Sequence, residues 1–433
     1  MAIAGAAPAG PAAYAAAPAY GAVPPFATPV TGLRERLLLV VLYLTVLASS
    51  VAVVEPSPHD ALMGVLLVAA LIAGVRFDRL LAVPFLLLML WNVAGLMSLM
   101  NVPGEEKTVQ YAATSVYLAV AAMIFAFLLT RNTASRVETL RAAYVLTATL
   151  AALAGIAGYF SLFPGAHAQF ATNDRALGGF KDPNVFGPFL IWPLLVVIER
   201  MLLRRITIVG LITAFIMLLG LLLSFSRGAW FHFTVSALVV VAISFISAEN
   251  QRVRLRLFVL TALAVVALAG LLMVLLSFSA IGEMFTNRAQ LIQSYDVGDG
   301  GRFKLQELAL AAMLQYPNGM GPFEFASVYG LQQHNVYLQA FLVYGWVGGV
   351  SYLLLLATTG WIAWRTVFIR TPWQPYLVVS FGTFVGLCAE GFIIDTDHWR
   401  HFFLLLGLIW GLAAASRHYV KNNSARYAPY VAR

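Results

Sequence analysis

Residues 256–278 read RLFVLTALAVVALAGLLMVLLSF, and no charged side chain follows Arg256 within this stretch. About 20 apolar residues are enough for a helix to cross the roughly 30 Å hydrocarbon core of a bilayer. The whole chain has this character, since 61% of its residues are hydrophobic and 11% are charged, whereas about 25% are charged in an ordinary soluble domain. The sequence therefore predicts an all-α integral membrane protein.

Comparable apolar runs recur along the chain, and we identify about twelve of them. They are 37–54, 60–76, 80–100, 110–130, 139–162, 185–199, 206–223, 229–247, 256–278, 335–364, 374–392 and 399–416. The second and sixth runs are short, and we expect them to extend into their flanks. This layout predicts one polytopic membrane domain over residues 33–417.

The two ends of the chain differ from this domain. Residues 1–32 are rich in Ala and Pro and carry no charge; because their prolines forbid a continuous helix, we predict a disordered tail. The tail lacks the positive start and apolar core of a signal peptide, so we interpret the first span as an uncleaved signal anchor. Residues 418–433 form a second predicted tail. Cys388 is the only cysteine, which excludes an intramolecular disulfide.

The distribution of Lys and Arg predicts the orientation of the spans. With twelve spans both termini lie on one side, and 19 of the 27 basic residues fall on that side. Cytoplasmic loops carry an excess of Lys and Arg, so we expect both termini in the cytoplasm. The net charge of +8 then reflects topology and does not indicate nucleic acid as a partner.

The eight basic residues on the other side are exceptions to this bias. They fall mainly in the loop 163–184, the turn 224–228, the loop 279–334 between the ninth and tenth spans, and the turn before Arg400. If these segments converge, they form a cationic pocket at the membrane face opposite the cytoplasm. Phosphate suits such a pocket because the planar guanidinium fork binds two oxygens at once.

Each of these cations also has a simpler interpretation. Arg227 could extend to lipid phosphates, but the short turn Ser226-Arg227-Gly228 leaves little room, and a charge held in the bilayer costs roughly 2.5–3.5 kcal/mol or more. Arg302 opens an amphipathic stretch, 303–316, of the kind that lies on a membrane surface. Lys181 could belong to a solvated connector, and Arg288 and Arg400 could be interfacial anchors.

Asp395-Thr396-Asp397-His398 contains ligand-type side chains and is the one candidate for a metal site. The same acids could instead cap the last span, since a helix N-terminus favours negative charge. No histidine pair or second acidic cluster accompanies them, so we favour no metal. The remaining histidines have no supporting constellation in the sequence; they are His59, His167, His232, His401 and His418.

The segment after the long loop carries the most specific pattern. His334-Asn335 is followed after nine residues by Gly345 and after two more by Gly348, which resembles the histidine motif of the O-antigen ligase and polymerase-related membrane family. The turn around Arg227, Gly301-Arg302, and the loop that contains Arg175, Asp182, Pro183 and Asn184 are similar as well. The resemblance implies a metal-independent, inverting glycosyltransferase of the GT-C type without a cofactor, with a long periplasmic loop between helices 9 and 10.

The resemblance also implies the substrates, in the bacterial inner membrane. The donor is a glycan on undecaprenyl diphosphate, and the acceptor is a lipid A-core sugar hydroxyl at the periplasmic face. Arg227 and Arg302 would stabilise the charge that develops on the diphosphate, and His334 would act as the base. The start of a helix at His334 would disfavour the imidazolium form. Further expected substrate contacts come from Arg175, Lys181, Asn184, Arg288, Asn335 and Arg400.

Other functions share part of this pattern. An O-antigen polymerase would have the same periplasmic arginines. A protein O-oligosaccharyltransferase usually has extra sequence after the last span, whereas here the run ending at residue 416 is followed only by residues 417–433. A flippase or transporter would place ionisable groups near the bilayer midplane, and Glu390 is the main residue whose depth is ambiguous.

Overall fold

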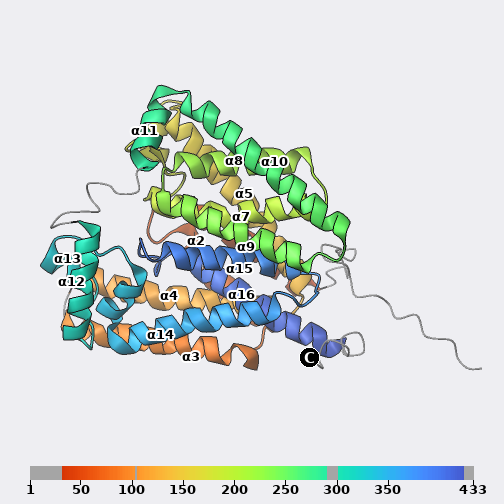
Figure 1. Ribbon diagram of the computed structural model, residues 1–433. Coiled ribbons are helices and arrows are strands. Elements are labelled where there is room, and N and C mark those ends of the chain that lie inside the picture. Colours follow the sequence, from red (N-terminus) through yellow and green to blue (C-terminus); the bar gives the residue numbers. More distant parts are fainter. Residues whose placement is uncertain (1–31, 103–104, 290–300, 424–433) are drawn as a thin grey trace, which may run out of the picture.

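The computed structural model describes residues 32–102, 105–289 and 301–423, and it shows one bundle of roughly parallel helices (Figure 1). The helices are α1 (Leu33–Leu47), α2 (Pro58–Ile72), α3 (Ala82–Ser98), α4 (Glu106–Leu129), α5 (Thr133–Tyr159), α6 (Ala166–Phe170), α7 (Pro183–Leu203), α8 (Ile208–Leu223), α9 (Arg227–Ser247), α10 (Gln251–Leu276), α11 (Ser279–Ala289), α12 (Arg302–Gln315), α13 (Glu324–Tyr329), α14 (Val336–Thr366), α15 (Gln374–Glu390) and α16 (Arg400–Asn422). A two-stranded antiparallel hairpin, β1 (Ala171–Thr172) and β2 (Arg175–Ala176), precedes α7.

The all-α class is confirmed, and each of the twelve predicted runs contains a helix. Among the described residues, eight helices are long and apolar enough to cross a membrane: α3 with its flanking 3₁₀ turns, α4, α5, α7, α9, α10, α14 and α16. The other four helices in the predicted runs are shorter: α1, α2, α8 and α15 have 15, 15, 16 and 17 residues. The structure therefore supports a multi-pass membrane protein, while twelve spans and the periplasmic position of the long loop stay predictions.

The segment 279–334 differs from the open loop that its polarity suggests. It contains α11, α12 and α13, and Figure 1 shows all three at one end of the bundle, which we call the loop end. The predicted amphipathic stretch 303–316 is confirmed as a helix, α12, which crosses the ends of the bundle helices. Leu305, Ala309 and Ala312 of α12 are buried in one cluster with Leu342 of α14, so an apolar face holds this helix against the bundle.

The described residues reach only part of the two predicted tails. Helix α16 continues to Asn422, so it includes the first residues of the tail predicted from residue 418. Of the predicted tail 1–32, only Gly32 lies within the described residues. The interpretation of Asp395 and Asp397 as caps of the last span is wrong, because α16 follows Trp399 without any side-chain cap.

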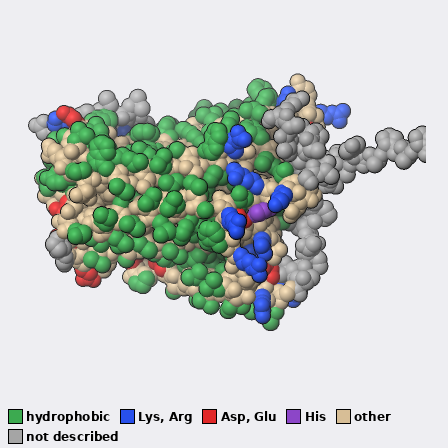
Figure 2. All heavy atoms as spheres, turned by 90° about the horizontal axis from the view of Figure 1, so that it is seen from below, with side chains coloured by type: hydrophobic (Ala, Val, Ile, Leu, Met, Phe, Trp, Pro, Cys, Tyr) green, Lys and Arg blue, Asp and Glu red, His purple; other side chains and the backbone are tan. Residues whose placement is uncertain are grey.

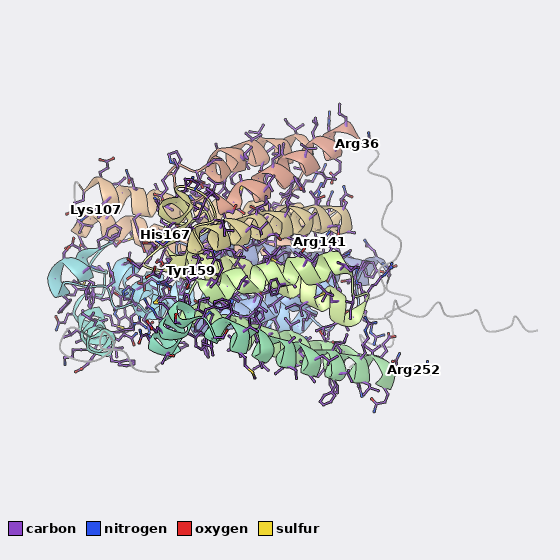
Figure 3. All side chains as sticks on the ribbon, turned by 90° about the horizontal axis from the view of Figure 1, so that it is seen from above. Arg36, Lys107, Arg141, Tyr159, His167 and Arg252 are labelled. Carbon is purple, nitrogen blue, oxygen red and sulfur yellow. The ribbon has the colours of Figure 1, made fainter. Side chains whose placement is uncertain are left out.

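Basic side chains gather at the end opposite the loop end. Figure 2 shows a band of Lys and Arg toward that end of an otherwise largely hydrophobic face. Figure 3 places Arg36, Arg141 and Arg252 there, and Lys107 and His167 at the loop end. The two sets that the sequence assigns to opposite sides of the membrane are thus separated along the bundle.

Helix α14 is broken inside the bundle. Gly345 has φ 66° and ψ −173°, a conformation that essentially only glycine adopts without strain. The loop before α13 satisfies the backbone at the break: Trp346 N donates to Pro317 O at 2.8 Å, and Met320 N donates to Leu342 O at 2.6 Å. Buried non-helical backbone requires such internal partners.

The topology predicts which positions a membrane-impermeant thiol reagent reaches. In a Cys388→Ala background, Ala168→Cys and Ala311→Cys should label from the periplasmic side of spheroplasts, whereas Gln251→Cys should label only after permeabilisation. All three positions are exposed. Ala168 and Ala311 lie at the loop end, and Gln251 lies at the opposite end. The reverse labelling pattern would place the loop end in the cytoplasm.

The break in α14 predicts a specific sensitivity at Gly345. A Cβ atom there would lie 2.6 Å from Asn318 C and 2.7 Å from Pro317 O, so Gly345→Ala should lower the free energy of unfolding by about 1–3 kcal/mol. Gly360→Ala in the same helix is the control, because its Cβ would meet only Phe384 at 3.7 Å. Thermal unfolding in detergent measures both variants, and equal stability of the two would contradict the strain at Gly345.

Candidate functional site

His334 lies directly before α14 with a left-handed backbone, φ 49°. The next residue, Asn335, is the N-cap: its Oδ1 accepts from Tyr337 N at 3.0 Å and from Leu338 N at 3.2 Å. Its Nδ2 donates to Phe392 O at 3.2 Å. The side chain of Asn335 is thus committed to fixing the start of α14, while the side chain of His334 is 48% exposed and accessible to a substrate.

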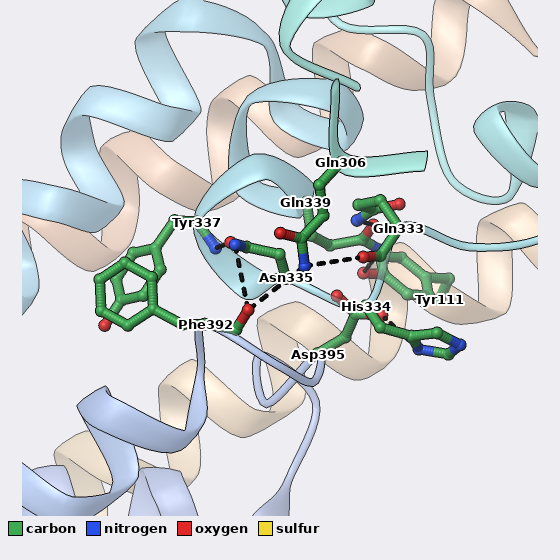
Figure 4. A network of polar contacts seen from close by, with 9 residues as sticks. All are labelled: Tyr111, Gln306, Gln333, His334, Asn335, Tyr337, Gln339, Phe392 and Asp395. Atoms are coloured by element: carbon green, nitrogen blue, oxygen red, sulfur yellow. Dashed lines mark hydrogen bonds and ion pairs between the residues drawn. The ribbon is translucent and has the colours of Figure 1, made fainter. Parts of the chain in front are cut away.

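Asp395 is the charged group beside His334. Its Oδ2 lies 3.6 Å from His334 Nδ1, and Figure 4 shows the two residues side by side at the start of α14. Burial raises the pKa of Asp395, although the contact with His334 opposes the rise. The other oxygen, Oδ1, is buried and has no hydrogen-bond partner among the described residues. The local environment of His334 is therefore set by this carboxylate, in addition to the helix start that the sequence suggested.

A polar network supports this site from behind. Gln333 Nε2 donates to Gln339 Oε1 at 2.5 Å, Gln339 Nε2 donates to Tyr111 OH at 3.3 Å, and Tyr111 OH donates to Asp397 Oδ2 at 2.7 Å. His398 Nδ1 lies 3.1 Å from the same oxygen. Burial works to raise the pKa of Asp397, but the charge of His398 and these hydrogen bonds hold it below its usual value. Asp397 thus ties α4 to the segment before α16.

Within the described ranges, no group of three or more His, Cys, Asp or Glu side chains is arranged to hold a metal ion. Asp397 and His398 instead bond each other and Tyr111.

Arg302 is the first residue of α12, and the helix points its first turn toward the His334 segment. Gln306 Nε2 contacts Gln333 O and Phe392 O, both at 3.4 Å. Residues four apart share one face of a helix, so Arg302 lies on the face that meets this segment. Lys304 pairs with Glu307 at 2.9 Å on the exposed surface.

Arg175 and Asn184 meet at the turn before α9. Arg175 Nε donates to Ser224 O at 2.8 Å, and its NH2 donates to Asn184 Oδ1 at 2.8 Å. Ser226 caps α9 by accepting from Ala229 N, and Arg227 is the first residue of the helix. The structure thus brings Arg175 and Asn184 to the turn that presents Arg227.

Helix α11 covers the same turn. Phe285 stacks on Trp230 of α9 with ring centroids 5.0 Å apart. Arg288 follows Phe285 by three residues and lies on the same face of α11. The contact of Phe285 with Trp230 therefore joins the helix that carries Arg288 to the first turn of the helix that carries Arg227.

The last turn of α15 joins the two halves of the site. Val336 N donates to Gly391 O at 2.9 Å, and Tyr337 OH donates to Cys388 O at 2.5 Å, so the start of α14 rests on α15. On the other side, Glu390 pairs with His232 of α9 at 2.8 Å. The sequence analysis did not predict this pair. The available signal was that His232 and Glu390 are both ionisable and lie within apolar runs, and such residues are rarely unpaired in a membrane.

Lys181 and Arg400 lie elsewhere, around a cavity of about 200 Å³ whose lining does not include His334, Arg227 or Arg302. Lys181 Nζ pairs with Glu55 Oε1 at 2.9 Å. Arg400 binds both oxygens of Asp60, through Nε at 3.0 Å and NH2 at 2.8 Å. The structure therefore places these two predicted contacts at a second location, with each cation already paired.

An exposed histidine beside a carboxylate, near arginines at the ends of apolar helices, suits acid–base chemistry on an anionic, membrane-embedded substrate. The eight long apolar helices among the described residues make this a multi-pass membrane protein. Residues 212–364 match the family model described as O-antigen ligase. The match covers about a third of the chain, and over these residues the chain is similar to O-antigen ligases. The matched segment contains Arg227, Arg288, Arg302, His334 and Asn335. A comparison with curated proteins finds no match.

The bidentate pair of Arg400 predicts a measurable coupling. Arg400→Gln and Asp60→Asn should each lower the free energy of unfolding by about 1.5–3 kcal/mol, the scale of a hydrogen bond to a charged group. The double variant should lose much less than the sum, because each single change leaves the other partner half-buried and unpaired. Thermal unfolding of the four proteins gives the coupling energy, and additive losses would show that the pair does not stabilise the fold.

Proposed function

We propose that this protein is an O-antigen ligase of the GT-C type that transfers a glycan from undecaprenyl diphosphate to a sugar hydroxyl of lipid A-core at the periplasmic face of the bacterial inner membrane. The observation that carries the proposal is the exposed His334 held 3.6 Å from Asp395, at the end of the bundle where α9 and α12 each begin with an arginine. The family match at residues 212–364 supports the same activity.

In this proposal the arginines hold the leaving group. Arg227 and Arg302 are the first residues of α9 and α12, and the backbone N–H groups at a helix start also favour an anion. Two such helix starts suit the two phosphates of the donor. They stabilise the negative charge that grows on the diphosphate as the glycosidic bond breaks. Arg175 and Asn184 hold the turn before Arg227, and Arg288 extends the cationic surface.

His334 acts on the acceptor. In an inverting displacement the acceptor hydroxyl oxygen bonds the anomeric carbon while the bond from that carbon to the diphosphate oxygen breaks. His334 takes the hydroxyl proton as the base. With Nδ1 directed toward Asp395, the other ring nitrogen, Nε2, is the one available to the hydroxyl. Asp395 orients the ring and stabilises the imidazolium that forms.

The other predicted contacts receive narrower roles. Because Asn335 uses its oxygen and its nitrogen within the protein, we propose that it positions His334. Lys181 and Arg400 are proposed to contact substrate from the cavity that they line. Arg400 offers there only the guanidinium nitrogen that does not bind Asp60.

Reconstitution tests the proposal directly. The purified protein in vesicles, given a glycan on undecaprenyl diphosphate and lipid A-core, should form the joined product without ATP and in the presence of EDTA. His334→Ala should lose transfer by about 10²–10⁴-fold, the scale of general-base removal, while it still binds the donor. Arg227→Ala and Arg302→Ala should weaken donor binding as well, and Lys substitutions should rescue poorly because they lose the bidentate geometry.

Lys304→Ala is the matched control, since Lys304 is exposed and paired with Glu307, and it should transfer normally. Elongation of the lipid-linked glycan, with no product on lipid A-core, would identify a polymerase instead. Unimpaired transfer by His334→Ala would remove the proposed base.

A further inference from the structure

His232 and Glu390 form a fully buried pair between α9 and α15. His232 Nδ1 lies 2.8 Å from Glu390 Oε2, and both side chains are 0% exposed. His232 Nε2 lies 3.0 Å from the carbonyl oxygen of Thr383. Because a carbonyl only accepts, Nε2 must carry a hydrogen. The hydrogen bond between His232 Nδ1 and Glu390 Oε2 requires a second proton, which is carried by one of these two atoms. In either case the pair as a whole has no net charge. This neutrality lowers the cost of its burial.

Glycines of α15 bring the two helices close enough for this pair. A Cβ atom on Gly386 would lie 2.6 Å from His232 Cδ2, and one on Gly382 would lie 2.5 Å from Val240 Cγ2. Small residues allow such close approach between membrane helices. These close contacts near Glu390 therefore fix how α9 and α15 are placed relative to each other.

The second oxygen of Glu390 reaches the start of α9. Oε1 is buried and has no hydrogen-bond partner among the described residues. A Cβ atom on Gly228 would lie 2.7 Å from it. Gly228 directly follows Arg227, so the glycine of the Ser226-Arg227-Gly228 turn makes the space that Glu390 occupies. The positive end of the α9 dipole favours an acidic oxygen there.

The same turn of α15 supports the start of α14 through Gly391 O, which accepts from Val336 N two residues after His334. Glu390 thus lies between the element that carries Arg227 and the element that carries His334. Neither Glu390 nor His232 is exposed to a substrate.

We propose that Glu390, with His232, is a positioning residue of the transfer reaction: it docks against Gly228 and so sets Arg227 at the correct place relative to His334. This inference rests on the proposed function. Glu390 acts through Arg227 and takes no part in bond making.

The test is a cycle of variants in the full-length reconstituted protein. Glu390→Ala should reduce transfer by about 10- to 100-fold, because a misplacement of about 1 Å costs up to about 10²-fold, and should raise the donor KM more than the acceptor KM. In an Arg227→Ala background the same change should cost nothing further. A pair that only stabilises the fold would lower the unfolding temperature but would leave the two losses of activity additive.

The space at Gly228 gives an independent arm. Gly228→Ala should impair donor binding because its Cβ collides with Oε1. In the double variant with Glu390→Ala this collision is absent, so donor binding should be no weaker than in Glu390→Ala alone. Gly270→Ala, at a helical position with nothing within 4 Å, is the control and should behave as wild type. Donor binding is measured with undecaprenyl diphosphate in vesicles, so this arm reports even if no transfer occurs.

Two failures are distinguishable. A wild-type protein that binds undecaprenyl diphosphate but does not join the glycan to lipid A-core would reject the proposed function. A wild-type protein that transfers, while Glu390→Ala keeps normal activity or adds its full loss to that of Arg227→Ala, would reject the positioning role.

Discussion

In the hydrocarbon core of a bilayer every backbone N–H and C=O must be hydrogen-bonded within the protein. This constraint makes the chain a helical bundle, and the few places where the backbone departs from a helix must find partners elsewhere. At the break in α14, the loop residues Pro317 and Met320 supply them. Gly345 of the histidine motif is therefore a structural requirement of the break, since a side chain there would collide with the same loop.

The candidate site occupies the loop end, where helices begin and end. Arg227 and Arg302 are first residues of helices, and His334 precedes the N-cap of a third. A cation at a helix start is opposed by the helix dipole. At Arg400, also a first residue, Asp60 offsets this cost with a bidentate pair. In the proposed function, Arg227 and Arg302 bind the donor diphosphate.

The last turn of α15 explains how distant motifs act together. Glu390 contacts α9 through His232 and lies against Gly228, and Gly391 bonds the start of α14. None of these three contacts joins residues that are near in sequence. The turn around Arg227 and the segment at His334 thus depend on one shared support, although each also has its own cap.

Hydrophobic composition and the placement of Lys and Arg by themselves determined the all-α class, the approximate helix positions and the two chemically distinct ends of the bundle, because insertion into a bilayer depends on local apolar length and charge. The amphipathic pattern also predicted α12. Only the tertiary structure decided which polar side chains meet. Asp395 with His334, Glu390 with His232 and Asp60 with Arg400 are each separated by tens to hundreds of residues, and their pairing follows from helix packing, which a local pattern does not encode.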